Sequence, residues 1–152
     1  MKSNFNQNLV VGQIGEEAVR KHLGSIYEVR DYTNYEVNKG YQQKGFDFEF
    51  FDKDSNTWER VEVKTNIQPK GFTFLELYKP DQTLGWFFTS KADWIYCYSL
   101  HTRDIFKYGI NSMRTYVDMG LKNLTLSLKE VRNKAKGIWV NVHSTPGIEK
   151  VT

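Results

Sequence analysis

Hydrophobic and polar residues follow two different periods in the first part of the chain. Residues 8–23 are mostly good helix formers and are followed by Gly24, a residue suited to the end of a helix. This pattern predicts a helix from about Asn8 to Leu23. Residues 26–30 alternate between apolar and polar positions and predict a strand, and a polar loop without clear periodicity follows over residues 33–45.

Two further alternating segments, Phe46–Phe51 and Trp58–Thr65, flank a polar, turn-forming stretch at residues 52–57. Two β-prone runs on either side of such a stretch are typical of an antiparallel hairpin with a longer loop. The early chain therefore predicts a helix followed by three strands.

The rest of the chain predicts shorter elements. We expect strands at residues 72–78, 94–100, 104–110 and 138–142, a helical turn at 89–93, a helix at 111–117 capped by Asn111 or Ser112, and a basic helix at 127–136. There is no internal repeat and no low-complexity segment. At about 150 residues per domain, the 152 residues predict one domain spanning 1–152.

Composition excludes several classes of protein. The single cysteine, Cys97, excludes an intramolecular disulfide framework, and the three scattered histidines do not form a zinc-binding pattern. Residues 1–13 lack the apolar run of a signal peptide, and no segment sustains the roughly 18 apolar residues of a membrane helix. We expect a soluble cytoplasmic protein with no membrane partner; a phage or a mobile element is one candidate source.

Charge is distributed unevenly along the chain. Residues 1–100 hold 12 Lys and Arg against 14 Asp and Glu, whereas residues 101–152 hold nine against four. Clustered carboxylates can hold cations, and Lys and Arg neutralise phosphates, so this asymmetry favours a nucleic-acid-binding protein with an acidic metal site. A solvated basic surface explains the charge count equally well.

Glu62-Val63-Lys64 is the only Glu-x-Lys sequence in the chain, and it lies in the second strand of the predicted hairpin. Because side chains alternate along a strand, Glu62 and Lys64 share one face, opposite to Val61 and Val63. Asp47 lies at the start of the first strand, and folding of the hairpin brings it opposite Glu62.

This set of side chains suits a divalent cation. Magnesium takes oxygen ligands and usually one or two carboxylates, with water and phosphate oxygens in the other positions, so Asp47 and Glu62 are candidate ligands. Lys64 is a candidate to activate the attacking water or to stabilise negative charge in the transition state. Charged residues that protect a strand edge are the alternative interpretation of the Glu-x-Lys pair.

The pattern Asp-(14 residues)-Glu-x-Lys, preceded by a helix with Gly12-x-x-x-Glu16, resembles the PD-(D/E)XK nuclease superfamily. Asp47, Glu62 and Lys64 match its motif, although Phe46 stands where proline is usual. The small size and the helix are similar to Holliday-junction resolvases, and residues 84–95 are similar to phage-type nucleases.

The resemblance implies a restriction-endonuclease-like α/β fold, with a mixed central β-sheet flanked by helices. It also implies a helical glutamate in the metal site. Glu16 shares a helix stripe with Val19 and Leu23, so we prefer it to Glu17, and both remain open.

The function implied is a DNA endonuclease that hydrolyses phosphodiester bonds with Mg²⁺, for which Mn²⁺ substitutes, and that acts as a homo-oligomer, a dimer or larger. Catalytic candidates are Glu16, Asp47, Glu62 and Lys64, of which the three carboxylates are the metal ligands. Candidate nucleic-acid contacts are the basic residues Lys44, Lys70, Lys91, Arg132, Lys134 and Lys136. An inactive DNA-binding module and an RNA-directed nuclease stay open, as does the choice between a site-specific homing or restriction enzyme and a structure-specific resolvase.

Overall fold

The computed structural model describes residues 2–33 and 45–152. Residues 34–44, most of the polar loop expected at 33–45, lie outside the described residues. The helices are α1 (Lys2–Gly24), the 3₁₀-helix η1 (Pro69–Gly71), α3 (Trp86–Thr89) and α4 (Ile110–Lys122). The strands are β1 (Val29–Asp31), β2 (Phe48–Asp52), β3 (Thr57–Asn66), β4 (Phe72–Tyr78), β5 (Trp94–Ser99), β6 (Ile105–Gly109), β7 (Lys129–Glu130), β8 (Lys136–Asn141) and β9 (Glu149–Lys150).

The central sheet has six strands in the order β1-β2-β3-β5-β6-β9. β3 and β5 are parallel, and the other neighbouring pairs are antiparallel, so the sheet is mixed. The predicted fold class, a mixed central β-sheet flanked by helices, is confirmed.

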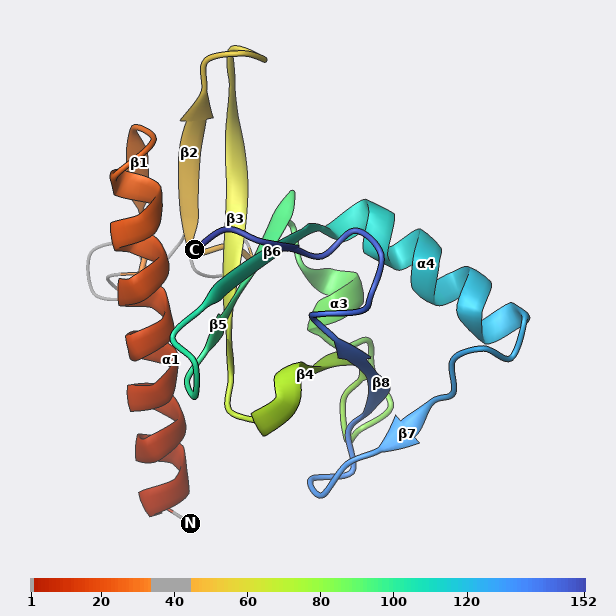
Figure 1. Ribbon diagram of the computed structural model, residues 1–152. Helices are drawn as coiled ribbons and strands as arrows, with labels where there is room; N and C mark the ends of the chain where they lie inside the picture. The colour runs from red at the N-terminus through yellow and green to blue at the C-terminus, as the bar shows by residue number, and fades with distance from the viewer. Residues whose placement is uncertain (1, 34–44) are drawn as a thin grey trace.

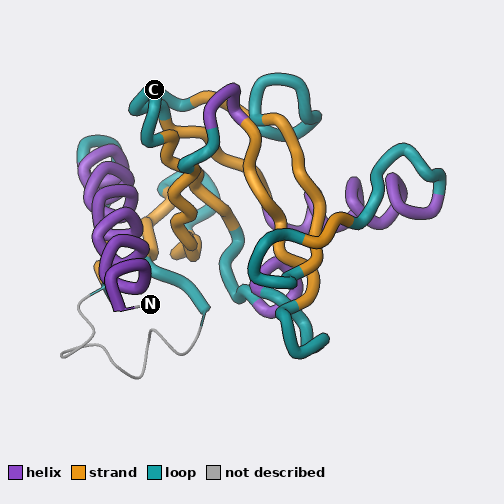
Figure 2. The backbone as a smooth tube through the Cα atoms, turned by 90° about the horizontal axis from the view of Figure 1, so that it is seen from below, coloured by secondary structure: helices purple, strands orange, loops and turns teal. Residues whose placement is uncertain are grey.

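The two faces of this sheet are covered by different elements (Figure 1). The long helix α1 packs along one face, where Val19 and Leu23 meet Phe48 and Val61 in one buried cluster. The other face carries α3, α4 and a second sheet of three strands in the order β4-β8-β7. Seen from below, α1 and α4 lie on opposite sides of the strands (Figure 2).

Side-chain alternation explains this layering. The odd-numbered residues of β4, among them Leu75 and Leu77, are buried, whereas its even-numbered residues face outward and are at least partly exposed. Cys97 of β5 lies in the same buried cluster as Leu75, as its apolar strand predicts. Burial raises the pKa of the Cys97 thiol to about 12, so this thiol is not a nucleophile.

Three local predictions are wrong. Residues 127–136 form no helix: Lys129 and Glu130 pair with the start of β8, and Lys134 has a φ of 70° in the intervening turn, which no helix tolerates. Pairing with β8 outweighs local helix propensity here. The short helix expected at residues 89–93 lies earlier, at Trp86–Thr89. The N-cap of α4 is Gly109 rather than Asn111 or Ser112.

Helix α1 begins at Lys2, six residues before the predicted start, and ends at Gly24. No helix within residues 2–33 and 45–152 is long and apolar enough to cross a membrane.

Candidate functional site

The β2–β3 hairpin brings Asp47 beside the segment of β3 that carries Glu62. The last ladder pair is Phe48 with Val61, and beyond it the Asp47 N–H donates to the Val61 carbonyl at 2.7 Å. The next hydrogen bond along β3 is made by the Asp47 side chain instead of a backbone carbonyl: Asp47 Oδ2 accepts from the Val63 N–H at 2.8 Å. This bond holds the carboxylate against the middle of β3.

Glu62 and Lys64 lie on the face of β3 that looks away from α1. Glu62 Oε1 lies 3.7 Å from Lys64 Nζ, and the two side chains are 15% and 32% exposed. Glu62 Oε2 is buried and has no hydrogen-bond partner among the described residues. Since a buried carboxylate oxygen without a partner is costly, this oxygen is available to a ligand that the protein chain does not supply.

Lys64 is held from its other side by an aromatic ring. Its Nζ lies 4.5 Å from the centre of the Trp86 ring, at the start of α3. Such a cation–π contact is worth about 0.5–2 kcal/mol. Trp86 is a residue that sequence reasoning did not assign to the site, since only the tertiary fold brings α3 beside β3.

The end of α3 is fixed by Arg114 of α4. The Arg114 guanidinium donates to the carbonyls of Phe87, Phe88 and Ser90 at 2.9, 3.2 and 3.0 Å. Arg114 therefore has a structural role in positioning Trp86. Of the three consecutive aromatic residues in α3, Phe87 is fully buried, Trp86 is partly buried and Phe88 is exposed.

Helix α1 brings Glu16, and not Glu17, towards Asp47. Burial raises the pKa of Glu16 to about 7, and the negative charges of Asp47 and Asp31 add to the shift. Glu17 is half exposed and forms an ion pair with Arg20, a contact that lowers the Glu17 pKa. Of the two candidate glutamates, Glu16 alone senses the charge of the hairpin carboxylate.

The pKa of the Asp47 carboxyl is raised, because the groups that favour its charged form do not balance those that disfavour it. Burial raises its pKa to about 6; the Val63 N–H and Lys64 oppose this shift, whereas Glu62 and Asp31 add to it. Desolvation and like charges therefore outweigh the hydrogen bond and the nearby ammonium.

Asp31 is a further acidic residue near Glu16 and Asp47, and the sequence analysis did not assign it to the site. It ends β1, next to the start of β2, and its Oδ1 accepts a hydrogen bond from the Thr33 N–H at 2.9 Å. The Asp31-Tyr32-Thr33 turn is the sequence signal that marks it. Asp31 also lines a small hollow of about 180 Å³ with Glu16, Gln13, Glu17, Arg20, Thr33 and Phe48.

The fit to a divalent cation rests on Asp47 and Glu62. Their carboxylates are the oxygen donors that Mg²⁺ prefers, and the unpartnered Glu62 Oε2 gives one of them a free coordination position. Within the described ranges, no three Asp, Glu, His or Cys side chains converge closely enough to hold a metal ion. The two hairpin carboxylates therefore suit a cation whose other ligands are water and phosphate oxygens, and Glu16 reaches it only indirectly in this geometry.

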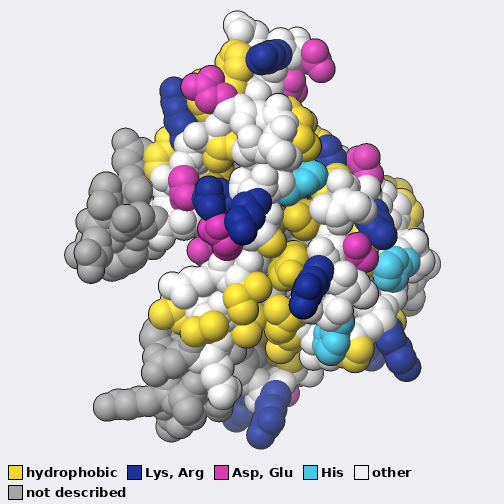
Figure 3. All heavy atoms as spheres, turned by 60° about the vertical axis from the view of Figure 1, so that its left-hand side comes forward, with side chains coloured by type: hydrophobic (Ala, Val, Ile, Leu, Met, Phe, Trp, Pro, Cys, Tyr) yellow, Lys and Arg dark blue, Asp and Glu magenta, His cyan; other side chains and the backbone are white. Residues whose placement is uncertain are grey.

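The predicted nucleic-acid contacts are spread over several elements. Lys70 lies in η1, Lys91 follows α3, and Arg132 and Lys134 lie in the turn between β7 and β8; all four are exposed, while Lys136 at the start of β8 is half-buried. Lys44 lies outside the described residues. On the face drawn in Figure 3, Lys and Arg side chains are scattered among acidic and hydrophobic ones rather than gathered into one patch.

No protein-family model matches the chain, and no curated protein matches it. Among solved structures, a bacterial homing endonuclease, I-Ssp6803I, is similar over 70% of this chain and 72% of that chain, with a TM-score of 0.46 and 11% sequence identity. At this TM-score two chains need not share a fold, so the function is inferred from the residues of this chain.

Proposed function

We propose that this protein is a divalent-metal-dependent DNA endonuclease of the PD-(D/E)XK type, hydrolysing phosphodiester bonds. One arrangement carries the proposal: Asp47 Oδ2 is held by the Val63 N–H at 2.8 Å, next to Glu62 in the chain, and Lys64 Nζ lies 3.7 Å from Glu62 Oε1. A structural interpretation of the same residues as exposed edge charges does not account for their burial or for the unpartnered Glu62 Oε2.

Each residue has a distinct role. Asp47 and Glu62 would hold Mg²⁺ or Mn²⁺, which when bound supplies Lewis-acid stabilisation of charge on the phosphate. Asp47 is fixed for this task by the Val63 N–H, and Glu62 by the rigid strand. Lys64 donates a proton or a hydrogen bond towards the reacting group, orienting the attacking water or stabilising the anionic transition state.

Glu16 supplies negative charge at the helix side of the site. Burial, and then the charges of Asp47 and Asp31, raise the pKa of Glu16, so a cation near Asp47 would favour the ionised form of Glu16 without contacting it. Double-strand cleavage needs two such sites, and we propose a homodimer or larger assembly with two-fold symmetry for this reason.

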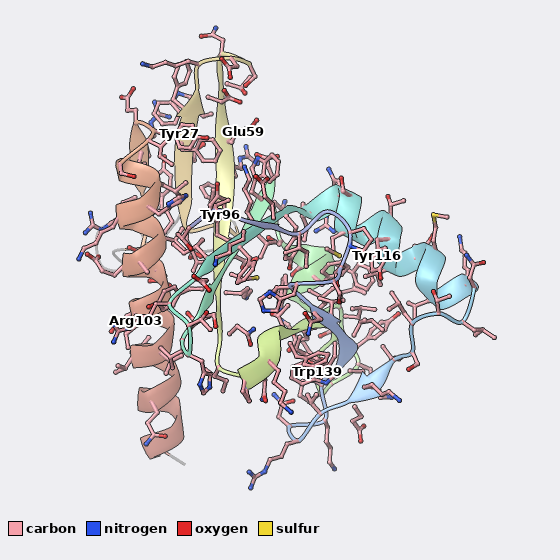
Figure 4. All side chains as sticks on the ribbon, viewed as in Figure 1. Tyr27, Glu59, Tyr96, Arg103, Tyr116 and Trp139 are labelled. Carbon is pink, nitrogen blue, oxygen red and sulfur yellow. The ribbon has the colours of Figure 1, made fainter. Side chains whose placement is uncertain are left out.

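The deciding experiment is cleavage of a supercoiled plasmid and of a synthetic four-way junction with Mg²⁺, with Mn²⁺ and with EDTA. The wild type is compared with Glu62→Gln and with Glu59→Gln, a control at another glutamate of β3 (Figure 4). We expect metal-dependent cutting by the wild type and by Glu59→Gln, with a loss of at least about 100-fold in Glu62→Gln.

Other outcomes separate the alternatives. Binding of DNA that survives EDTA, without cutting at any metal concentration, indicates an inactive binding module. Cutting of single-stranded RNA, dependent on the 2′-hydroxyl, indicates an RNA-directed nuclease. Preference for the junction over the plasmid distinguishes a resolvase from a site-specific enzyme.

A further inference from the structure

A second and larger hollow lies beside the three-stranded sheet. It encloses about 860 Å³ and is lined by Phe74 of β4, Trp139 of β8, Ile67 and Gln68 after β3, Val131, Arg132 and Asn133 of the β7–β8 turn, and Gln7 of α1. Its size lies within the roughly 300–1,000 Å³ typical of small-ligand pockets. Figure 4 shows Trp139 at the lower part of this sheet.

Two aromatic rings form one wall. The ring centres of Phe74 and Trp139 lie 5.0 Å apart at 53° to each other, and neither side chain is fully buried. Phe74 and Trp139 are directly paired across β4 and β8, so the rings are fixed by the sheet register. Each ring therefore offers its own apolar face, on which a base can stack.

Apart from the two rings, the lining combines the apolar Ile67 and Val131 with four polar or positive side chains. Arg132 lies exposed at the rim, and Gln7, Gln68 and Asn133 add three amide side chains. Asn133 Oδ1 accepts a hydrogen bond from the Ala135 N–H at 3.0 Å, which holds this amide in place. Among the described residues that line the hollow, none is acidic. Amides match the hydrogen-bonding edges of bases, and arginine matches phosphate.

Strands β3 and β4 connect this hollow to the proposed catalytic residues. Lys64 Nζ lies against the Trp86 ring, and the backbone N–H of Trp86 donates to Glu76 Oε1 at 3.4 Å. Glu76 and Phe74 share the outward face of β4, about 7 Å apart along the strand. Ile67 and Gln68 also follow β3 directly after the segment that holds Glu62 and Lys64.

We propose that this hollow binds an unpaired base of the DNA substrate next to the bond that is cut. The inference rests on the proposed nuclease function and adds a substrate class to it: DNA with an unstacked nucleotide, such as a bulge or a flap. In a regular duplex the faces of the bases are covered by their neighbours, so only an unstacked base can reach the rings of Phe74 and Trp139.

The test measures binding with 2-aminopurine, a fluorescent base, placed either in a single-base bulge or in a fully paired duplex. All proteins carry Glu62→Gln, which prevents cutting. Phe74→Leu and Trp139→Leu keep apolar volume but remove the stacking surface, and Arg132→Gln removes the exposed cation. Lys53→Gln, at the exposed tip of the β2–β3 hairpin, is the control.

We expect the bulged duplex to bind about tenfold more tightly than the paired one, with quenching of the bulged base. Each leucine variant should lose about tenfold on the bulged DNA and less than about twofold on the paired DNA, in keeping with base–aromatic stacking. Arg132→Gln should reduce the salt slope of binding by about one. Lys53→Gln should match its parent. Circular dichroism checks folding, and if one leucine variant is unfolded the other and Arg132→Gln carry the test.

Equal affinity for bulged and paired DNA, or unchanged quenching in both leucine variants, would overturn the inference, as would tighter binding of the same bulge in RNA. The binding readout needs no cleavage, so the two proposals fail separately. If the wild type cuts plasmid but the protein does not bind the bulged DNA more tightly, only the proposed base pocket is refuted. If the protein binds the bulged DNA more tightly but the wild type never cuts, only the proposed nuclease function is refuted.

Discussion

Gly15 of α1 lies directly against the side chain of Thr65 of β3. A Cβ at residue 15 would overlap Thr65 Oγ1, so the absence of a side chain lets the helix approach the strand closely. Glu16 follows immediately, and this close approach is what brings its carboxylate within the field of Asp47.

Gly15→Ala should therefore destabilise the protein by about 1–3 kcal/mol, because the added methyl forces α1 away from β3. Gly12→Ala is the matched control, since a Cβ at residue 12 meets no atom within 4 Å. An alanine there should leave stability unchanged or raise it by up to about 1 kcal/mol. Urea unfolding of both variants provides the measurement; equal stability of the two would refute the close contact.

Glu16→Gln should lower the rate of cleavage, whereas Glu17→Gln should leave it within about twofold of the wild type. Glu16 lies near Asp47, and Glu17 points to solvent, where it pairs with Arg20. Initial rates on plasmid at several Mg²⁺ concentrations measure the difference. We expect a higher metal requirement for Glu16→Gln alone, and the reverse order would assign the helical glutamate to residue 17.

The stability of the metal-free protein should depend on the charge of Asp47. Its pKa is raised from 3.8 to about 6 on folding, so the folded state holds a proton that the unfolded state releases. The resulting stabilisation is present below about pH 4 and is lost as the pH rises through 6, an effect of about 3 kcal/mol at most. Glu16 has a pKa of about 7 and should add a similar loss of stability at slightly higher pH.

Thermal unfolding in EDTA between pH 4 and pH 8 measures this loss. Asp47→Asn keeps an acceptor for the Val63 N–H but cannot ionise, so the difference in free energy of unfolding between wild type and variant should fall with rising pH. Mg²⁺ at pH 8 should stabilise the wild type more than Asp47→Asn. Parallel pH curves for the two proteins would contradict the assigned shift.

Trp86→Leu should lower kcat by about 2–30-fold with a smaller change in KM, because the ring positions the Lys64 ammonium. Trp86→Phe should recover much of the loss, since it retains an aromatic face. Phe88→Leu, on the same short helix but packed on Tyr78, is the control. A fall in kcat of equal size in all three would indicate a general disturbance of α3.

The sequence predicted the hairpin because its information is local. Alternation on both sides of one turn is enough to predict the pairing of β2 with β3, which the structure shows, with Asp47 bonded to Val61 and Val63 at the base of the hairpin. The predicted catalytic and metal-binding roles of these residues await the experiments above.

What could not be predicted depends on distant partners. Gly12 was the glycine of the expected motif, but Gly15 is the one in contact, and only the position of Thr65 reveals this. Trp86 reaches Lys64 through the packing of α3, and residues 129–130 become a strand because β8 lies beside them. Local sequence patterns do not show which distant residues will pack against a segment.

The hairpin register also shows what the 14-residue separation between Asp47 and Glu62 means. It measures the length of the two arms and their turn, whereas the position of Asp47 beside β3 depends on its hydrogen bonds to Val61 and Val63 at the base of the arms. Relatives with longer or shorter arms would keep the same pair at a different spacing, so a search with fixed spacing would miss them. The exposed tip around Ser55 is equally a place to attach a dye or an affinity tag without disturbing the site.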